Sequence, residues 1–265
     1  MHSAEEDPGQ STAEQGARAF LFAPGSVPWT DEDTALLIAE SRQVSVELSV
    51  RQAQQLALLC QVVAGATVNV SGLRTVPEIR RKHLVDSLAC LPVAALGRGE
   101  RVLDLGTGAG FPGLVAAIAC PDLDLTLLDA AKKKTEFVVG AAASIGLAVH
   151  VVQGRAEELA RDQAWRQSFD CVLARAVAPL PALLEYGLPL VRQGGRLIAL
   201  KGPGVDAELA AAGRALRLLG GEVEVDQRVE LPGGAGVRRI LRIRQKANVP
   251  VTYPRRAAAI GRRPL

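Results

Sequence analysis

The chain has 265 residues, of which 48% are hydrophobic and 22% are charged. A wholly disordered protein is excluded, because this much apolar surface can offset the entropy lost on ordering. The longest apolar stretch, residues 114–120, is far shorter than the roughly 20 residues that cross a bilayer. The acidic first ten residues contain no apolar run of the kind that a secretory signal needs. We therefore expect a cytoplasmic protein without a membrane anchor, and no feature of the sequence requires more than a monomer.

The cysteines and histidines are too scattered for a metal centre or a redox pair. The four cysteines, at positions 60, 90, 120 and 171, lie at least 30 residues apart, and only three histidines occur. Neither a CxxC pair nor a zinc knuckle is therefore available. We expect buried free thiols and no metal site.

The net charge of +3 hides an uneven distribution along the chain. Residues 1–40 carry eight acids and one base, whereas residues 238–265 carry nine bases and no acid. A basic end is typical of a nucleic-acid binder, because each cation near a phosphate releases condensed counterions. A solvated run of surface charge is the alternative. Aromatic residues make up only 3% of the chain, which argues against a single-strand binder built on base stacking.

The first third of the chain consists of a tail followed by helical segments. Residues 1–29 mix acids with Gly, Ser, Thr and Pro without periodicity, which predicts a disordered acidic tail. Apolar residues then recur at near-helical spacing, and a further helix is predicted at 78–91. We therefore assign residues 30–95 to a helical N-terminal preface.

Beyond the preface, short apolar runs alternate with helical segments. Strands are predicted at 101–105, 124–129, 148–152, 169–174, 195–201, 222–230 and 237–244, and helices at 112–119, 132–145, 181–191 and 205–219. This alternation indicates an α/β fold with a doubly wound, mostly parallel sheet. The last two strands are joined by a short Gly- and Pro-rich loop, so they form an antiparallel edge hairpin. This domain covers residues 96–246, and a basic C-terminal tail covers 247–265.

The first strand of this series leads into a glycine-rich turn. Residues 101–114 read R-V-L-D-L-G-T-G-A-G-F-P-G-L. Gly106 and Gly108 let the backbone turn sharply and let a ligand approach it closely. Ligands in such sheets bind at the carboxyl ends of the strands. Asp129 ends the second strand, where its carboxylate can accept hydrogen bonds from the hydroxyls of a ribose.

Two cofactors compete for this turn. Residues 108–113 match the GxGxxG pattern of dinucleotide-binding proteins, which is a weak signal by itself. An acid at the strand end, here Asp104, followed by a GxGxG that begins at Gly106, is instead typical of class I (Rossmann-like) methyltransferases that bind S-adenosyl-L-methionine. Asp129 suits either cofactor, so it does not decide between them.

From about residue 67 to the C-terminus, the sequence resembles the RsmG (GidB) family of bacterial 16S ribosomal RNA guanine-N7 methyltransferases. The turn D-L-G-T-G-A-G-F-P-G at 104–113 looks like the signature of that family. Further segments agree in order: R-K-H-L-V-D-S-L (81–88), L-L-D-A-A-K-K-K-T-E-F (127–137), G-R-A-E-E-L (154–159), F-D-C-V-L-A-R-A-V-A-P-L (169–180), L-I-A-L-K-G (197–202) and V-T-Y-P-R-R (251–256).

The resemblance implies S-adenosyl-L-methionine-dependent methylation of guanine N7 in the decoding-region loop of 16S ribosomal RNA, a modification that the family links to the streptomycin response. The implied partner is the small ribosomal subunit. Implied cofactor-binding positions are Gly106, Gly108, Phe111, Asp129, Ala156, Glu157 and Arg175. The resemblance further implies Arg175 and Lys201 as catalytic residues, and Lys133, Arg155, Arg255 and Arg256 as RNA-binding residues.

Each of these assignments has a plainer alternative. Arg175 could form a surface ion pair, and Glu157 could be a solvated residue that opens a short helix. Lys133 lies among three lysines at a predicted helix start, where the helix dipole disfavours cations, and that cost hints at a phosphate partner. A plain solvated run explains the lysines equally well. His83 and Asp86, three residues apart in the preface, are expected to pack it against the core.

The segment after the fourth strand indicates a reaction without a general base. Methyltransferases acting on exocyclic amines often place an acid or amide followed by Pro-Pro and an aromatic here, whereas this chain reads R-A-V-A-P at 175–179. Guanine N7 already presents a lone pair in the ring plane, so attack on a sulfonium methyl requires no proton abstraction. Catalysis would then come from positioning and from stabilising charge that develops on the purine.

Two other functions stay open on the sequence. An NAD-dependent oxidoreductase would use the same glycine turn, and a non-catalytic ribosome-assembly factor that binds RNA would carry a degenerate cofactor pocket. The intact turn, Asp129 and Arg175 argue against the second of these.

Overall fold

A computed structural model describes residues 28–265 of the chain, so the predicted disordered tail lies almost entirely outside the described residues. The strands are β1 (Arg101–Leu105), β2 (Asp124–Asp129), β3 (His150–Gln153), β4 (Phe169–Arg175), β5 (Val191–Lys201), β6 (Gly221–Leu231) and β7 (Gly236–Gln245). The longer helices are α2 (Asp31–Gln43), α3 (Val50–Ala64), α7 (Gly113–Ala119), α8 (Lys132–Ser144), α10 (Leu180–Gly187) and α11 (Val205–Leu219). No helix among residues 28–265 is long and apolar enough to cross a membrane.

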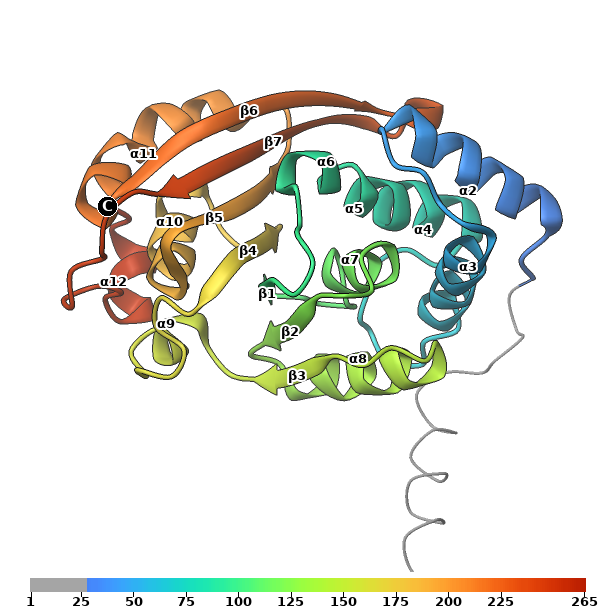
Figure 1. Ribbon diagram of the computed structural model, residues 1–265, viewed down its shortest axis with the longest axis horizontal. Helices are drawn as coiled ribbons and strands as arrows, with labels where there is room; N and C mark the ends of the chain where they lie inside the picture. The colour runs from blue at the N-terminus through green and yellow to red at the C-terminus, as the bar shows by residue number, and fades with distance from the viewer. Residues whose placement is uncertain (1–27) are drawn as a thin grey trace, which may run out of the picture.

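The strands form one seven-stranded sheet in the order β3-β2-β1-β4-β5-β7-β6 (Figure 1). The first five in this order pair in parallel, and β7 pairs antiparallel with both β5 and β6. The predicted doubly wound sheet with an antiparallel edge hairpin is therefore confirmed. The strand order reverses between β1 and β4, and this reversal is the point where sheets of this type open a crevice for ligands.

Helices cover both faces of the sheet. Successive residues of a strand face opposite sides, so each strand contributes side chains to two separate cores. In β1, Val102 belongs to the hydrophobic core formed with the preface, α7 and α8, whereas Leu103 belongs to the core formed with α10 and α11. Both side chains are fully buried. Near-continuous apolar strands of this kind are what a sheet covered on both sides requires.

The preface packs as helices on the first of these faces, but its second predicted helix is not continuous. In place of one helix over 78–91, the chain forms α4 (Val76–Ile79), a π-helical turn η1 (Arg80–Val85), α5 (Asp86–Leu88) and, after a short turn, α6 (Leu91–Ala94). A π-helical turn contains an extra residue and is common at functional sites. Its position beside the end of β4 is described below.

The boundary between the helix predicted at 181–191 and the strand predicted at 195–201 also differs from the prediction. The helix expected over 181–191 ends at Gly187, a 3₁₀ turn η2 (Leu188–Leu190) follows, and β5 begins at Val191 instead of residue 195. The proline at 189 explains the early end, because it has no backbone N–H to donate to the carbonyl oxygen of Glu185 and the α-helical ladder stops there.

The preface is anchored by a buried guanidinium group. Arg80 of η1 is 2% exposed and donates to Asp33 Oδ1 at 2.6 Å and to Glu40 Oε2 at 3.0 Å, both on α2. Arg81 donates to the second oxygen of Glu40 at 3.2 Å. These bonds fix α2 against the π-helical turn, so the preface is held by charge pairing as well as by apolar packing.

The C-terminal segment is also packed against the domain. It contains a short helix α12 (Ala257–Arg262), whose Ile260 is fully buried. Arg166, in the loop before β4, donates to the carbonyl oxygens of Val249 and Tyr253 at 2.7 and 2.8 Å. The carboxylate of Glu185 on α10 is completely buried and accepts three hydrogen bonds from Arg255, two from the guanidinium and one from the backbone N–H.

This ion pair predicts different effects for two neighbouring arginines. We expect Arg255→Ala to lower the free energy of unfolding by roughly 2–4 kcal/mol, because it leaves the Glu185 carboxylate buried without its counter-ion. Arg256→Ala should change it by less than about 0.5 kcal/mol, since Arg256 is exposed. Urea unfolding of both variants measures this. Equal stability of the two would show that Glu185 does not depend on Arg255.

Candidate active site

The carboxyl ends of four adjacent strands meet at one edge of the sheet and carry the predicted site residues. Gly106 directly follows β1, Asp129 ends β2, Arg175 ends β4 and Lys201 ends β5. Their strands are neighbours in the sheet, in the order β2-β1-β4-β5. Parallel strands that are adjacent in this way place their last residues side by side, so the structure brings these four predicted residues to one edge of the sheet.

The glycine turn requires glycine for conformation and for space. Gly106 and Gly108 have φ values of 69° and 61°, in the left-handed region that side chains disfavour. A Cβ on Gly106 would lie 3.0 Å from Cγ2 of Val177, and one on Gly113 would lie 2.1 Å from Cδ2 of Leu127. The turn therefore touches both the segment after β4 and the neighbouring strand β2.

The buried side chain of Asp104 stabilises this turn. Its Oδ2 accepts from the hydroxyl of Thr107 at 2.6 Å and from the backbone N–H of Gly113 at 2.8 Å. The side chain is completely buried, and its Oδ1 has no hydrogen-bond partner. Burial raises the pKa of Asp104 to about 6, although the two hydrogen bonds act in the opposite direction. The acid at the strand end thus stabilises the turn from inside.

Asp129 connects the turn to the end of β2. Its Oδ2 accepts from the N–H of Gly108 at 3.0 Å, and its Oδ1 accepts from the N–H of Ala131 at 2.9 Å. The amino group of Lys134 lies 3.8 Å away. Each carboxylate oxygen has two lone pairs, so both retain capacity for a further donor.

A pocket of about 280 Å³ opens beside this turn. Five predicted residues line it: Gly106, Asp129, Arg155, Ala156 and Glu157. The lining also includes residues that sequence reasoning missed: Lys134, Gly154, Ala176, Val177 and Tyr186. Ala156 and Glu157 belong to the short helix α9 (Ala156–Leu159), which follows β3.

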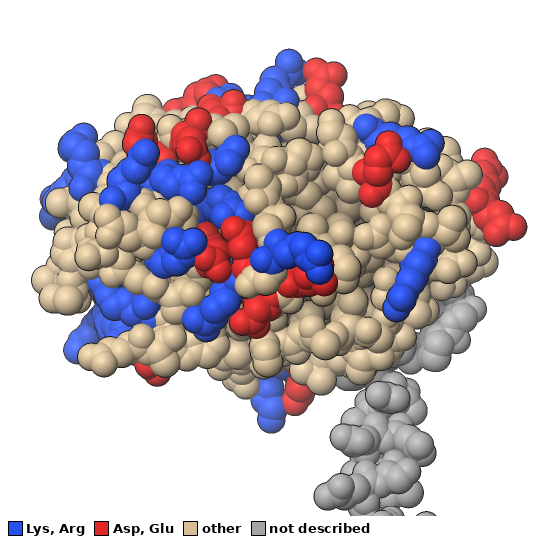
Figure 2. Space-filling view, in the orientation of Figure 1, with Lys and Arg blue, Asp and Glu red and all other residues tan. Residues whose placement is uncertain are grey.

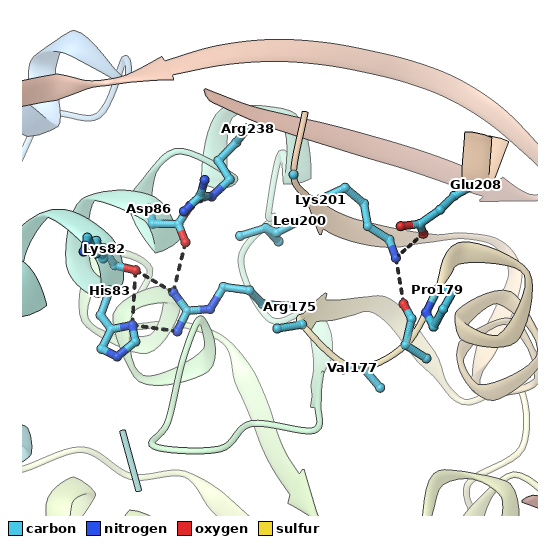
Figure 3. Close-up of a pocket in the computed structure, with 13 residues that line it drawn as sticks. Lys82, His83, Asp86, Arg175, Val177, Pro179, Leu200, Lys201, Glu208 and Arg238 are labelled. Atoms are coloured by element: carbon cyan, nitrogen blue, oxygen red, sulfur yellow. Dashed lines mark hydrogen bonds and ion pairs between the residues drawn. The ribbon is translucent and has the colours of Figure 1, made fainter. Parts of the chain in front are cut away.

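A second, larger pocket of about 550 Å³ adjoins the first. Ala176 and Val177 line both pockets, and Ala176 has a φ of 55°, rare for a residue with a side chain. Arg175 and Lys201 line the larger pocket, as do five charged or titratable residues from other elements: Lys82, His83, Asp86, Glu208 and Arg238. Figure 3 shows Arg175, Asp86 and Arg238 on one side of this pocket and Lys201 with Glu208 on the other.

Arg175 is held by three acceptors on the preface. Its guanidinium donates to Asp86 Oδ2 and to His83 Nδ1, both at 3.1 Å, and to the carbonyl oxygen of Lys82 at 3.2 Å. The other oxygen of Asp86 accepts from Arg238 Nε at 2.7 Å. The side chain of Asp86 is only 5% exposed, so this carboxylate joins the preface to β4 and to β7.

His83 is neutral in this arrangement. Nδ1 of His83 lies 3.1 Å from both the guanidinium of Arg175 and the carbonyl oxygen of Lys82, and Nε2 lies 2.7 Å from Ser71 Oγ. Both ring nitrogens therefore have hydrogen-bonding neighbours, whichever of them carries the proton. Burial, together with the charge of Arg175, lowers the pKa of His83 to about 4. The ring stacks on Phe111 of the glycine turn with centroids 4.6 Å apart. His83 and Asp86 thus pack the preface against the core, as predicted, and also line the larger pocket.

Comparison with known proteins identifies the family. A model of the GidB family, described as rRNA small subunit methyltransferase G, matches residues 51–231. The chain belongs to this family. The ribosomal RNA small subunit methyltransferase G of Symbiobacterium thermophilum is 43% identical over 205 residues, which are 75% of this chain and 83% of that protein. The protein of the same name from Deinococcus deserti is 40% identical over 236 residues, or 88% and 97% of the two chains.

Among solved structures, a mutant of MtNAS shares the fold, with a TM-score of 0.52 at 16% identity over 82% of this chain and 78% of its own. The predicted class I methyltransferase fold is confirmed, and the chain is an rRNA methyltransferase. The oxidoreductase alternative is therefore excluded. Family membership equally favours an enzyme over the assembly-factor alternative.

In this rRNA methyltransferase, five predicted site residues line neither pocket: Gly108, Phe111, Lys133, Arg255 and Arg256. Phe111 is 3% exposed beneath His83, and Gly108 contributes its N–H to Asp129. Arg175 lines the larger pocket only, although it was assigned to the cofactor as well. Lys133 is exposed at the first turn of α8.

The basic end of the chain is largely neutralised by acids on neighbouring elements. Six of its nine bases form ion pairs: Arg238 with Asp86, Arg239 with Asp206 and Asp226, Arg242 and Arg244 with Glu224, Lys246 with Glu222, and Arg255 with Glu185. Figure 2 shows basic and acidic side chains interspersed over much of the face drawn. Arg256, Arg262 and Arg263 are exposed, and no ion pair joins them to the described residues.

The cysteines behave as ordinary core residues. Cys60, Cys90 and Cys171 are buried and Cys120 is half-buried, and all four are free thiols. Burial raises the pKa of Cys60 and of Cys171 to about 12, so these thiols are protonated near neutral pH. Within residues 28–265, no group of three His, Cys, Asp or Glu side chains could hold a metal ion.

The lowered pKa of His83 predicts a pH-dependent contribution to stability. Between pH 6.5 and about 4 the unfolded chain binds a proton at His83 that the folded chain does not, so acidification destabilises the fold through this residue. His83→Gln removes that effect, although it also removes the stacking on Phe111.

We therefore expect the stability advantage of the wild type over His83→Gln to be largest above pH 7 and to shrink as the pH falls to about 4. Urea unfolding of both proteins at several pH values measures this difference. A difference that is the same at every pH would contradict a His83 that is neutral in the folded chain.

Proposed function

We propose that this enzyme transfers the methyl group of S-adenosyl-L-methionine to N7 of a guanine in 16S ribosomal RNA, in the decoding-region loop of the small subunit. The observation that carries the proposal is the pair of adjoining pockets, which share Ala176 and Val177. A methyl transfer needs a donor site and an acceptor site that meet at one point. Because the proposed substrate is the small ribosomal subunit, we place the enzyme in the cytoplasm, where that subunit lies.

The residues of the smaller pocket fit S-adenosyl-L-methionine. Gly106 lines this pocket with backbone alone, and both its left-handed φ of 69° and the 3.0 Å separation that a Cβ would have from Val177 Cγ2 favour glycine there. Asp129 has lone pairs free for the hydroxyls of a ribose, and Ala156 and Glu157 supply backbone and carboxylate groups for an adenine edge. When bound, the cofactor supplies a methyl group on a positively charged sulfur.

The residues of the larger pocket support positioning without proton abstraction. Both carboxylates in it are paired with cations, Asp86 with Arg175 and Arg238, and Glu208 with Lys201. Both ring nitrogens of His83 have hydrogen-bonding neighbours, and its pKa is lowered to about 4, so the ring is a poor proton acceptor near neutral pH. Among the described residues, no carboxylate of this pocket is therefore without a cationic partner. Arg175 and Lys201 would orient the guanine through its acceptor edge.

Exposed bases support contact with RNA phosphates. Arg155 lines the smaller pocket, and Lys133 and Arg256 are exposed without an ion pair to the described residues. We assign these three, with the predicted Arg255, to the RNA interface, although the guanidinium of Arg255 is already held by Glu185. Cations that meet phosphates should make binding weaker as salt rises.

The function is tested by methyl transfer from labelled S-adenosyl-L-methionine to small subunits that lack the modification, followed by nucleoside analysis. We expect label in 7-methylguanosine at a single site. Label in another nucleoside, or no transfer despite bound S-adenosylhomocysteine, would overturn the proposal.

The Arg175→Ala variant tests how the larger pocket works. Loss of a donor that orients the acceptor should lower the transfer rate roughly 100-fold, while the shape of the pH–rate profile stays that of the wild type because no general base is lost. Arg214→Ala, at an exposed position on α11, is the control for loss of a positive charge. A profile newly governed by a single titrating group would contradict a mechanism without a general base.

A further inference from the structure

Lys201 and Glu208 form a fixed pair on one wall of the larger pocket (Figure 3). The amino group of Lys201 donates to Glu208 Oε2 and to the carbonyl oxygen of Ala178, both at 2.7 Å. Glu208 Oε2 also accepts from the backbone N–H of Leu180 at 2.6 Å. The pair therefore joins β5, α11 and the start of α10, so neither side chain is free to change its conformation cheaply.

Each member of the pair keeps one unused hydrogen-bonding group. An ammonium has three protons, and two of those on Lys201 are committed, so one donor remains. Both bonds to Glu208 go to Oε2, and Oε1 accepts from no described residue. The side chain of Glu208 is 33% exposed, and it lines the pocket. The wall thus offers a donor and, beside it, an acceptor.

This order of groups complements one purine. Along its Watson–Crick edge guanine presents O6 as an acceptor, followed by N1–H and N2–H₂ as donors, whereas adenine presents a donor at N6 followed by an acceptor at N1. From this complementarity, and resting on the proposed function, we infer that Lys201 contacts O6 and that Glu208 Oε1 accepts from N1–H and N2–H₂ of the target guanine. Glu208 is then the residue that selects guanine.

The carboxylate on the opposite wall of the pocket is less suited to accept hydrogen bonds from this edge of guanine. Asp86 is the other carboxylate of the pocket, and its two oxygens accept from Arg238 and from Arg175. Its side chain is 5% exposed, compared with 33% for Glu208. Among the described residues of this pocket, Glu208 is therefore the carboxylate that combines an oxygen without a hydrogen-bond partner and a side chain exposed to a ligand.

The same contact would strengthen during the reaction. N7 and O6 are neighbours on the purine, so a base held at O6 by Lys201 can direct N7 toward Ala176 and Val177, where the two pockets meet. When the N7 lone pair forms a bond to the methyl carbon, the carbon–sulfur bond breaks and the purine becomes positively charged. The N1–H and N2–H₂ protons become more acidic, and their hydrogen bonds to a carboxylate become stronger. Stabilisation that grows toward the transition state is the kind that accelerates a reaction.

The test compares guanosine with inosine, which differs only by the missing 2-amino group. Small subunits are reconstituted with 16S RNA that carries either nucleoside at the methylated position, and kcat/KM for transfer to N7 is measured. In the wild type we expect inosine to be poorer by roughly tenfold or more, the loss typical of a hydrogen bond to a charged group. In Glu208→Gln, kcat/KM for guanosine should fall roughly tenfold to a hundredfold, and the ratio between the two substrates should approach one.

Glu208→Gln is chosen because its amide oxygen can still accept from Lys201 and Leu180, which leaves the amide nitrogen, a donor, facing the donors of guanine. Asp206→Asn is the matched control: it removes an ion-paired carboxylate two residues away on α11 that does not line the pocket. This variant should keep both the rate and the ratio of the wild type. Binding of S-adenosylhomocysteine should stay near wild type in both variants, and the ratio between the two substrates is the readout that a merely structural role of Glu208 would leave unchanged.

The outcomes separate this inference from the function on which it rests. If Glu208→Gln lowers transfer to both substrates by the same factor, or changes neither, Glu208 does not read the base and the inference is overturned. If the wild type methylates neither substrate at N7, the proposed function itself is overturned.

Discussion

The contact between the glycine turn after β1 and the segment after β4 is the constraint on which the site depends. Gly106 approaches Val177 so closely that a Cβ would lie 3.0 Å from its Cγ2. The chain meets this requirement with a left-handed Gly106 on one side and a left-handed Ala176 on the other. Because Ala176 and Val177 line both pockets, this contact fixes where the two pockets meet.

The preface acts on this junction through charge. Asp86 lies on the preface, yet its carboxylate accepts from Arg175 at the end of β4 and from Arg238 on the antiparallel strand β7. A buried carboxylate between two guanidinium groups is costly to rearrange, since removing either partner leaves charge uncompensated. The π-helical turn adds the carbonyl of Lys82 and the ring of His83 to the same guanidinium. The helical preface is therefore part of the wall of the larger pocket.

The sequence predicted what depends on local pattern and missed what depends on distant pairing. Strand and helix alternation and the turn at 104–113 follow from neighbouring residues, and the structure confirms both. The Asp86–Arg238 pair joins residues 152 positions apart, and no pattern along the chain indicates it. Glu208 carries no motif and was missed for the same reason. The basic end was correctly counted, but its meaning changed, because most of its charges face acids that the fold brings to them.

That neutralisation bears on how the enzyme separates binding from catalysis. The paired bases of β7 fix the antiparallel edge, and Arg238 also fixes the pocket wall. Exposed bases such as Arg155 and Arg256 remain for long-range attraction of a polyanion. Salt screens this attraction, with a Debye length of about 10 Å at 0.1 M ionic strength. A buried pair such as Asp86–Arg175 is screened far less. Exposed charges that salt screens can thus attract a ribosomal substrate, and buried charges that salt screens far less can then orient it.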